Sequence, residues 1–323
     1  MVAFRDKLVD GLMKRGIGVT FELSDAPYAA ILIIGGTRDL MGLWRAKRHG
    51  VRITQRLDGM NWIHRIRRTG WRHYLRAEYG NMILSLIRSR LADQIIYQSK
   101  FSQQWWKRVY GVNDIPWRVI YNGVDLERYT PAGSEKIPDD HVRILLVEGS
   151  IGGGYEWGLE TAVHLAERLY SINNRDVEAM VAGRVAEVLQ REWSTKTMVR
   201  VNFMGQVPPG RIPELCRSAH MLYAADLNPS CPNSVIEALA CGLPVVAFDT
   251  GALSELVTKV AGKLVPYGGD PWKMDPPDME GLVEAAIIVQ NNQADFRRAA
   301  RKRAEEALGI DLMVDSYLGA LNI

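Results

Sequence analysis

Short apolar runs alternate with longer amphipathic segments along the chain, which predicts strands and helices in turn. In the first part, strands are predicted at 19–22, 30–34, 51–55, 94–98 and 118–121, and helices at 4–15, 40–49, 60–90 in pieces and 101–110. In the second part, strands are predicted at 143–148, 177–182, 199–204, 221–224 and 245–248, with one helix ending near 169 and another spanning 311–321. This alternation predicts an α/β protein with parallel sheets covered on both faces.

One polar, turn-rich stretch, residues 129–140, interrupts this pattern and contains two prolines. Such composition is typical of a linker between domains. We therefore expect a first domain over residues 1–130 and a second over residues 141–305.

A carboxylate stands on a short helix predicted just before the strand at 245–248. Pro232 is tolerated in a first helical turn, and Gly242 followed by Pro244 ends the helix. Helical spacing places Glu237 on the same face as Ser234, opposite the apolar residues that would hold the helix on the sheet. Glu237 is thereby predicted to face a ligand cleft, although an ordinary surface glutamate is an equal alternative.

The segment 231–246, Cys-Pro-Asn-Ser-Val-Ile-Glu-Ala-Leu-Ala-Cys-Gly-Leu-Pro-Val-Val, with Gly251 and Glu255 after it, resembles the donor-site signature of family 4 glycosyltransferases. Residues 97–106 and 119–125 are similar to the end of that family's first domain. The resemblance runs from about residue 16 to the C-terminus. It implies a GT-B fold, two Rossmann-like parallel-sheet domains facing a cleft, with residues 306–323 as a final helix packing back on the N-terminal domain.

The start of the chain departs from the family pattern. A GT-B protein normally begins with a strand and a glycine-rich loop, whereas this chain opens at its first predicted helix. We therefore expect an N-terminal domain that lacks its usual first strand, with a gap between the strands at 19–22 and 51–55 and exposed sheet edges.

The resemblance also implies roles for particular residues in the second domain. Glu237 would bind ribose hydroxyls, and the main-chain amides of Asn233 and Ser234 would approach the phosphates. The loop after the strand at 199–204 would pack on the base, and it contains Gly205, Gln206 and Val207.

Three family positions hold unexpected residues. Ser150 and Tyr155 stand where an arginine and a lysine usually hold the diphosphate, and Pro229 replaces the first acid of a paired-glutamate motif. Amides of Gly152, Gly153 and Gly154 could form an anion-binding nest instead, or simply a flexible turn. Arg184 could supply the lost charge, and Asn228 could replace the acid as a contact to the transferred sugar.

In the first domain, Arg56, Asp58 and Gly59 follow a predicted strand and are expected on the acceptor side. Asp58 either orients the acceptor hydroxyl or caps the next helix. With Glu237, it is our candidate for a catalytic residue. His64 and His73 lack a periodic partner and are weak candidates for a catalytic base.

Composition narrows the setting. The chain has 323 residues, 47% hydrophobic, a net charge of +3 and three cysteines. No apolar run approaches the roughly 20 residues that span a bilayer, and the cysteines have no metal spacing, so a reducing cytoplasm and no metal or other cofactor are expected. Residues 43–90 hold twelve Lys or Arg against two acids, with three tryptophans interleaved. This segment favours peripheral contact with an anionic membrane over nucleic acid, or is simply a solvated helix pair.

The sequence therefore predicts a retaining glycosyltransferase that moves a sugar from a nucleotide-sugar donor to a saccharide or lipid-linked acceptor. Resemblance to the family implies a front-face route without a covalent enzyme intermediate. The alternatives are a catalytically impaired nucleotide-sugar-binding protein of the same fold and a sugar-nucleotide epimerase, for which Asp58 and Asp249 are the candidate acid–base pair.

Overall fold

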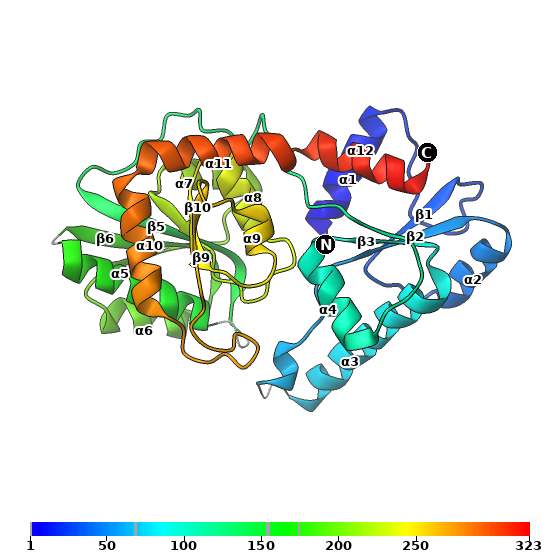
Figure 1. Ribbon diagram of the computed structural model, residues 1–323, viewed down its shortest axis with the longest axis horizontal. Coiled ribbons are helices and arrows are strands. Elements are labelled where there is room, and N and C mark those ends of the chain that lie inside the picture. Colours follow the sequence, from blue (N-terminus) through cyan, green and yellow to red (C-terminus); the bar gives the residue numbers. More distant parts are fainter. Residues whose placement is uncertain (1, 68–69, 153–155, 174) are drawn as a thin grey trace. The chain divides into compact units, whose positions relative to one another are not determined.

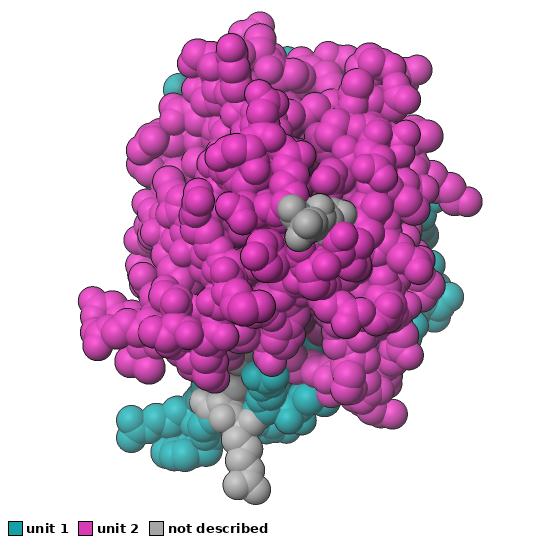
Figure 2. Space-filling view, turned by 90° about the vertical axis from the view of Figure 1, so that its left-hand side faces the viewer, with its two compact units in different colours: residues 1–123, 309–323 teal, residues 124–308 magenta. Residues whose placement is uncertain are grey.

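The computed structural model describes residues 2–67, 70–152, 156–173 and 175–323. The chain forms two compact units, coloured separately in Figure 2. Unit 1 comprises Met1–Gly123 and Gly309–Ile323, and unit 2 comprises Val124–Leu308. The stretch 129–140, expected to be a linker, belongs to unit 2, where the Tyr129 hydroxyl donates to the Pro209 carbonyl at 3.1 Å.

Unit 1 contains a four-stranded parallel sheet with helices around it (Figure 1). Its strands, in the order β1-β2-β3-β4, are β1 (Ala30–Ile34), β2 (Arg52–Leu57), β3 (Gln94–Tyr97) and β4 (Trp117–Val119). Its α-helices are α1 (Val2–Lys14), α2 (Leu40–Arg48), α3 (Trp71–Leu86), α4 (Lys100–Tyr110) and α12 (Ile310–Leu321). A 3-10 turn at Ile63–Arg65 precedes α3, and a π-helical turn at Ile87–Leu91 follows it.

No strand forms at 19–22, so that prediction is wrong. These residues belong to the loop between α1 and β1, and the apolar side chains Val19 and Phe21 are 36% and 66% exposed. Alternation without a covered face gives no strand, because burial of one face is what stabilises such a pattern. The expected gap between strands at 19–22 and 51–55 is therefore wrong as well, since β1 pairs directly with β2.

The first and last helices of the chain lie side by side in unit 1 (Figure 1). Phe4, Leu8 and Leu12 of α1 share one apolar core with Val314 and Tyr317 of α12. The rings of Phe4 and Tyr317 lie 5.4 Å apart. The C-terminal helix thus packs within the unit formed by the N-terminal part of the chain.

Unit 2 contains a six-stranded parallel sheet in the order β10-β9-β8-β5-β6-β7. The strands are β5 (His141–Ile151), β6 (Asp176–Val185), β7 (Arg200–Gly205), β8 (Met221–Tyr223), β9 (Val245–Phe248) and β10 (Gly262–Val265). The helices are α5 (Trp157–Asn173), α6 (Glu187–Lys196), α7 (Ile212–Arg217), α8 (Asn233–Ala240), α9 (Leu253–Leu256), α10 (Met279–Asn291) and α11 (Gln293–Ala307).

The strand order of unit 2 reverses beside β5. The chain runs outward from β5 to β6 and β7, then returns to β8, the other neighbour of β5, and continues to β9 and β10. Open α/β sheets bind ligands outside the carboxyl ends of their strands at such a switch point. The topology of unit 2 therefore predicts a ligand-binding site at the loops after β5 and β8.

Candidate functional site

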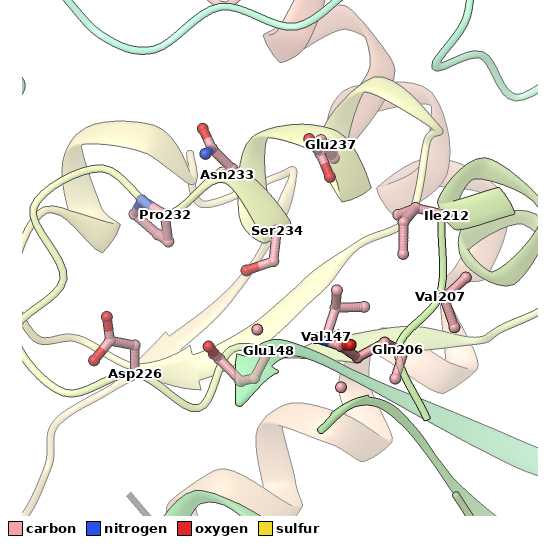
Figure 3. Close-up of a pocket in the computed structure, with 13 residues that line it drawn as sticks. Val147, Glu148, Gln206, Val207, Ile212, Asp226, Pro232, Asn233, Ser234 and Glu237 are labelled. Carbon is pink, nitrogen blue, oxygen red and sulfur yellow. The ribbon is translucent and has the colours of Figure 1, made fainter. Parts of the chain in front are cut away.

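A cavity of about 370 Å³ lies at the carboxyl ends of the strands of unit 2 (Figure 3). Its walls come from the ends of β5 and β6, the loops after β7 and β8, and helices α7 and α8. The lining residues are Val147, Glu148, Gly149, Ala182, Gly183, Gln206, Val207, Ile212, Asp226, Pro232, Asn233, Ser234 and Glu237. The cavity thus occupies the switch point that the strand order singles out.

Helix α8 forms one wall of this cavity. Pro232 is its N-cap residue, with φ −70° and ψ 122°, and α8 begins at Asn233. Val235 and Leu239 are fully buried against unit 2, which fixes the opposite face, carrying Ser234 and Glu237, on the cavity. The free amides and partial positive charge of a helix N-terminus attract anions, so the cavity has one anion-attracting wall.

Two carboxyl groups face α8 from the strand side of the cavity (Figure 3). Burial, together with the neighbouring charge of Asp226, raises the pKa of Glu148 to about 8. Burial also raises the pKa of Asp226 to about 6, although a backbone hydrogen bond from Leu227 opposes that shift. Glu148 thus holds its proton to a higher pH than Asp226 does.

Five of the predicted donor-binding residues line the cavity, namely Gln206, Val207, Asn233, Ser234 and Glu237. Gly205 is not among the lining residues, but its φ of +66° turns the chain from β7 into the loop that carries Gln206. Arg184 is exposed on β6 beside Ser150 of β5 and does not line the cavity. The charge that Arg184 was expected to supply is therefore not on the cavity wall.

Asn228 lies outside the cavity lining as well. It is 5% exposed with a left-handed φ of +56°, and its Nδ2 has no hydrogen-bond partner among the described residues. Pro229, at the position of the missing acid, accepts a hydrogen bond from the Ala252 amide at 2.8 Å. Its backbone is packed so closely against Gly251 that a Cβ there would overlap it. This segment is held by backbone contacts.

The triglycine loop lies partly outside the described residues. Gly152 follows β5 and is half-buried, whereas Gly153, Gly154 and Tyr155 fall in the gap at 153–155. The predicted anion nest therefore stays a prediction. Ser150 lines a neighbouring cavity of about 230 Å³ that shares Glu148 and Asp226 with the first.

The three predicted acceptor-side residues lie in unit 1, at and after the end of β2. Arg56 is buried, with its guanidinium 3.7 Å from the centroid of the Phe4 ring and a hydrogen bond of 2.7 Å to Asn122. Asp58 and Gly59 are half-buried. Asp58 does not cap the next helical turn, whose N-cap is Trp62, so the capping interpretation is wrong.

Several cations of residues 43–90 are engaged inside unit 1. Lys47 pairs with Asp93 at 2.7 Å, and Arg65 pairs with Glu78 at 2.6 Å. Arg88 is buried and donates to the Tyr97 hydroxyl at 3.0 Å. Arg65 and then His64 lower the pKa of Glu78 to about 2 by hydrogen bonding. Part of the basic segment is thus structural.

The remaining part of that segment is an exposed apolar face bordered by arginines. Exposed apolar side chains on α2 and α3 are Met41, Trp44, Trp71, Tyr74, Leu75, Tyr79, Met82 and Leu86. A shallow cavity of about 300 Å³ between Trp44 and Leu86 joins the two helices. The exposed arginines nearby are Arg45 and Arg48 on α2, Arg72 and Arg76 on α3, and Arg90 on the π-helical turn that follows α3. We name this surface the α2–α3 face.

Glu148 and Asp226 are the functional candidates that sequence reasoning missed. Glu148 directly follows four apolar residues of a predicted strand, and Asp226 stands two residues after another such strand. Acids at the carboxyl ends of neighbouring parallel strands meet at one edge of the sheet. The signal was therefore present in the sequence.

Within 2–67, 70–152, 156–173 and 175–323, no three or more His, Cys, Asp or Glu side chains are grouped to hold a metal ion. In the same ranges, no helix has the length and apolar character needed to cross a bilayer.

Comparison with known proteins places this geometry in a family. Residues 143–289 match the family model described as glycosyl transferases group 1, and residues 37–128 match the model described as glycosyltransferase family 4. A D-inositol 3-phosphate glycosyltransferase of Gordonia bronchialis is 25% identical over 248 residues, which cover 71% of this chain. A similarly described protein of Kribbella flavida is 24% identical over 67% of this chain. The chain spans 53% and 58% of the length of these two relatives.

Solved structures share the architecture at lower sequence identity. Sucrose-phosphate synthase of Thermosynechococcus elongatus superposes with a TM-score of 0.69 at 17% identity, covering 93% of this chain and 74% of that one. HepE of Anabaena, solved with UDP-glucose, gives a TM-score of 0.66 at 18% identity, covering 90% and 78%. These similarities show the GT-B fold. The two family models, over residues 37–128 and 143–289, place this chain in the family 4 glycosyltransferases.

Proposed function

We propose that the chain is a retaining glycosyltransferase whose nucleotide-sugar donor binds in the cavity of unit 2. The observation that carries this proposal is the cavity itself, at the switch point of a parallel sheet and walled by the first turns of α8. Family membership and the UDP-glucose bound to HepE support it.

Each wall of the cavity suits a different part of the donor. The Glu237 carboxylate, three residues beyond Ser234, suits the ribose hydroxyls because it accepts hydrogen bonds from them. The amides of Asn233 and Ser234 suit the diphosphate. Gln206 and Val207, in the loop after β7, suit the base.

Transfer would break the bond between the anomeric carbon of the sugar and the diphosphate oxygen. Negative charge then develops on the diphosphate, and preorganised amides at the start of α8 would stabilise it. In the front-face route of the family, a phosphate oxygen takes the proton of the acceptor hydroxyl, so no protein nucleophile is needed. The proposal includes no metal ion, and Asp58 of unit 1 is proposed to orient the acceptor.

The test is transfer or hydrolysis from a panel of uridine, guanosine and adenosine diphosphate sugars in buffer containing EDTA. Glu237→Ala removes a charged hydrogen-bond acceptor, which contributes about 1.5–3 kcal/mol, so affinity for the nucleotide falls about 10- to 100-fold. Glu284→Ala, on the exposed side of α10, is the matched control and leaves activity unchanged.

Three results would count against this function. Glu237→Ala with wild-type affinity would show that the cavity is not the donor site. Nucleotide affinity without turnover on any donor would indicate a binding protein of the same fold. Conversion of a donor without any acceptor would indicate an epimerase.

We also propose that the α2–α3 face binds the anionic inner surface of a membrane, where a lipid-linked acceptor would be available. Helical spacing puts Trp71, Leu75, Tyr79, Met82 and Leu86 on one side of α3. Exposed arginines on α2 and α3 border them, and each basic residue near an anionic surface contributes about 1 kcal/mol. Apolar insertion together with basic attraction favours a lipid surface.

Co-sedimentation with vesicles tests this contact. The wild type binds vesicles rich in phosphatidylglycerol, releases with added salt and ignores phosphatidylcholine vesicles. The double variant Leu75→Ser, Met82→Ser binds several-fold more weakly, whereas the control Val188→Ser, Met198→Ser, at exposed apolar positions of unit 2, does not. If the double variant of α3 binds vesicles as tightly as the unit 2 control, the membrane proposal is contradicted. It is also contradicted if the wild type binds RNA more tightly than vesicles.

A further inference from the structure

The cavity of unit 2 has an unusual charge for a diphosphate site. Its described walls carry three acids, Glu148, Asp226 and Glu237, and no lysine, arginine or histidine. If these acids were all ionised, a bound diphosphate would meet repulsion on the strand side of the described walls, opposite the attraction at the start of α8. The inference below rests on the proposed function, since it concerns how the donor is held.

The position of Glu148 is fixed by its backbone. It lies near the end of β5, where the pairing with β6 shifts register between Val147 and Ser150. Gly183 of β6, with φ +151°, packs so closely on the Glu148 carbonyl that a Cβ there would overlap it. Glu148 is thus held at the cavity wall between β6 on one side and the loop after β8 on the other.

The charged groups on the elements around Glu148 are mostly acidic. Asp226 follows β8, Glu237 lies on α8, Glu156 and Glu160 lie at the start of α5, and Arg184 lies on β6. Of these, only Asp226 and Glu237 line a cavity together with Glu148. The Asp226 charge, added to burial, opposes ionisation of Glu148. A neutral carboxylic acid has one O–H donor, which an ionised one lacks.

We propose that Glu148 meets the donor as a neutral acid and donates a hydrogen bond to a diphosphate oxygen, with Asp226 as the positioning residue that keeps the proton there. Glu148 then does part of what the absent cations at Ser150 and Tyr155 would do. No bond is made or broken in this step, and the proton stays on Glu148.

Nucleotide binding then becomes linked to pH. Once Glu148 ionises, it loses the donor and repels the diphosphate, so affinity falls by up to tenfold for each pH unit above its titration. The terminal phosphate of a nucleoside diphosphate titrates near pH 6, so it contributes little above pH 7. Between about pH 7 and 9.5, a change in nucleotide affinity therefore reflects titration of the protein and not of the nucleotide.

The experiment is calorimetric titration of uridine, guanosine and adenosine diphosphates into the full chain between pH 7 and 9.5, in EDTA. Wild-type affinity for the nucleotide that binds best falls at least tenfold over this window. Glu148→Gln keeps an N–H donor, so it binds well at every pH with a flat profile. Glu148→Ala has no donor and binds more weakly than Glu148→Gln throughout.

Two further variants complete the design. Asp226→Asn removes the charge that holds the proton on Glu148, so the loss of affinity begins at lower pH. Glu284→Gln, an exposed acid on α10, follows the wild-type profile. Thermal unfolding without ligand confirms that each variant is folded.

The proposal is overturned if Glu148→Gln shows the wild-type pH profile, or if Glu148→Ala binds as tightly as Glu148→Gln. The titrations are repeated with excess Mg²⁺ in place of EDTA, and binding that appears only with Mg²⁺ also overturns the proposal, because both carboxylates would then act as ionised metal ligands. If none of the three nucleotides binds the wild type or any variant at any pH, with EDTA or with Mg²⁺, the proposed donor site itself fails. These outcomes separate the two proposals.

Discussion

Single side chains set the electrostatics of the candidate site. Glu237 provides an acceptor on α8, and Glu148 and Asp226 provide two acids on the opposite wall whose pKa values lie above their ordinary ones. Raised pKa values of neighbouring acids in a cleft are typical of functional sites. Such a pair also costs folding stability, because the unfolded chain ionises these groups more easily. That cost can be measured without a ligand.

The pKa of Glu148 is about 8 when folded and 4.5 ordinarily, so the folded protein holds the proton more tightly than the unfolded chain. Glu148 therefore costs no folding stability below about pH 4.5, where it is neutral in both states. As the pH rises toward 8, its ionisation in the unfolded chain lowers the free energy of unfolding. Glu148→Gln does not titrate, so its advantage in melting temperature over the wild type grows between pH 5 and 8. We expect a gain of at least about 1 kcal/mol at pH 8, or about 2–4 °C.

Differential scanning calorimetry at pH 5 and pH 8 measures this gain, with Glu284→Gln as the variant that shows none. A melting-temperature difference that stays constant between the two pH values would contradict the assignment of a shifted carboxyl at residue 148.

At the level of elements, strands β6, β8 and β9 of unit 2 were predictable because they are buried on both faces and are largely apolar. The run at 245–248 is confirmed as β9. The strand predicted at 19–22 does not form, because the apolar side chains Val19 and Phe21 are not buried by another element. Strand β10, Gly-Lys-Leu-Val, was not predicted, because it is short and has no clear alternation. Burial by other elements, which decides both cases, is not written locally in the sequence.

The packing of α1 on α12 offers a test at this scale. A Cβ at Gly11 of α1 would overlap the stiff side chain of Val314, whereas a Cβ at Gly319 of α12 meets nothing within 4 Å. Both glycines are helical, so alanine gains about 0.5–1 kcal/mol of helix propensity at either position. Overpacking at Gly11 costs about 1–3 kcal/mol, which Gly319→Ala avoids.

We expect urea unfolding to show Gly319→Ala as slightly more stable than the wild type. Gly11→Ala should be less stable than Gly319→Ala by about 1–3 kcal/mol. Equal stability of the two variants would contradict the close contact between α1 and α12.

At the scale of the whole molecule, the two-unit α/β architecture followed from the alternation of runs and helices, and the resemblance supplied the GT-B fold. The cavity-lining residues Asn233, Ser234, Glu237, Gln206 and Val207 followed from the family signature. Two features could not be predicted, because each depends on neighbours in three dimensions. These are the position of Arg184 outside the cavity lining and the raised pKa of Glu148.

We propose that a nucleotide-sugar donor binds in the cavity at the carboxyl ends of the unit 2 strands. The decisive experiment is a crystal structure of the protein with the nucleoside diphosphate that binds best. We expect the ribose hydroxyls within hydrogen-bond distance of Glu237 and the phosphates at the amides that begin α8. A nucleotide bound elsewhere, or one bound with Glu237 out of reach of its ribose, would show that the proposed donor site is wrong.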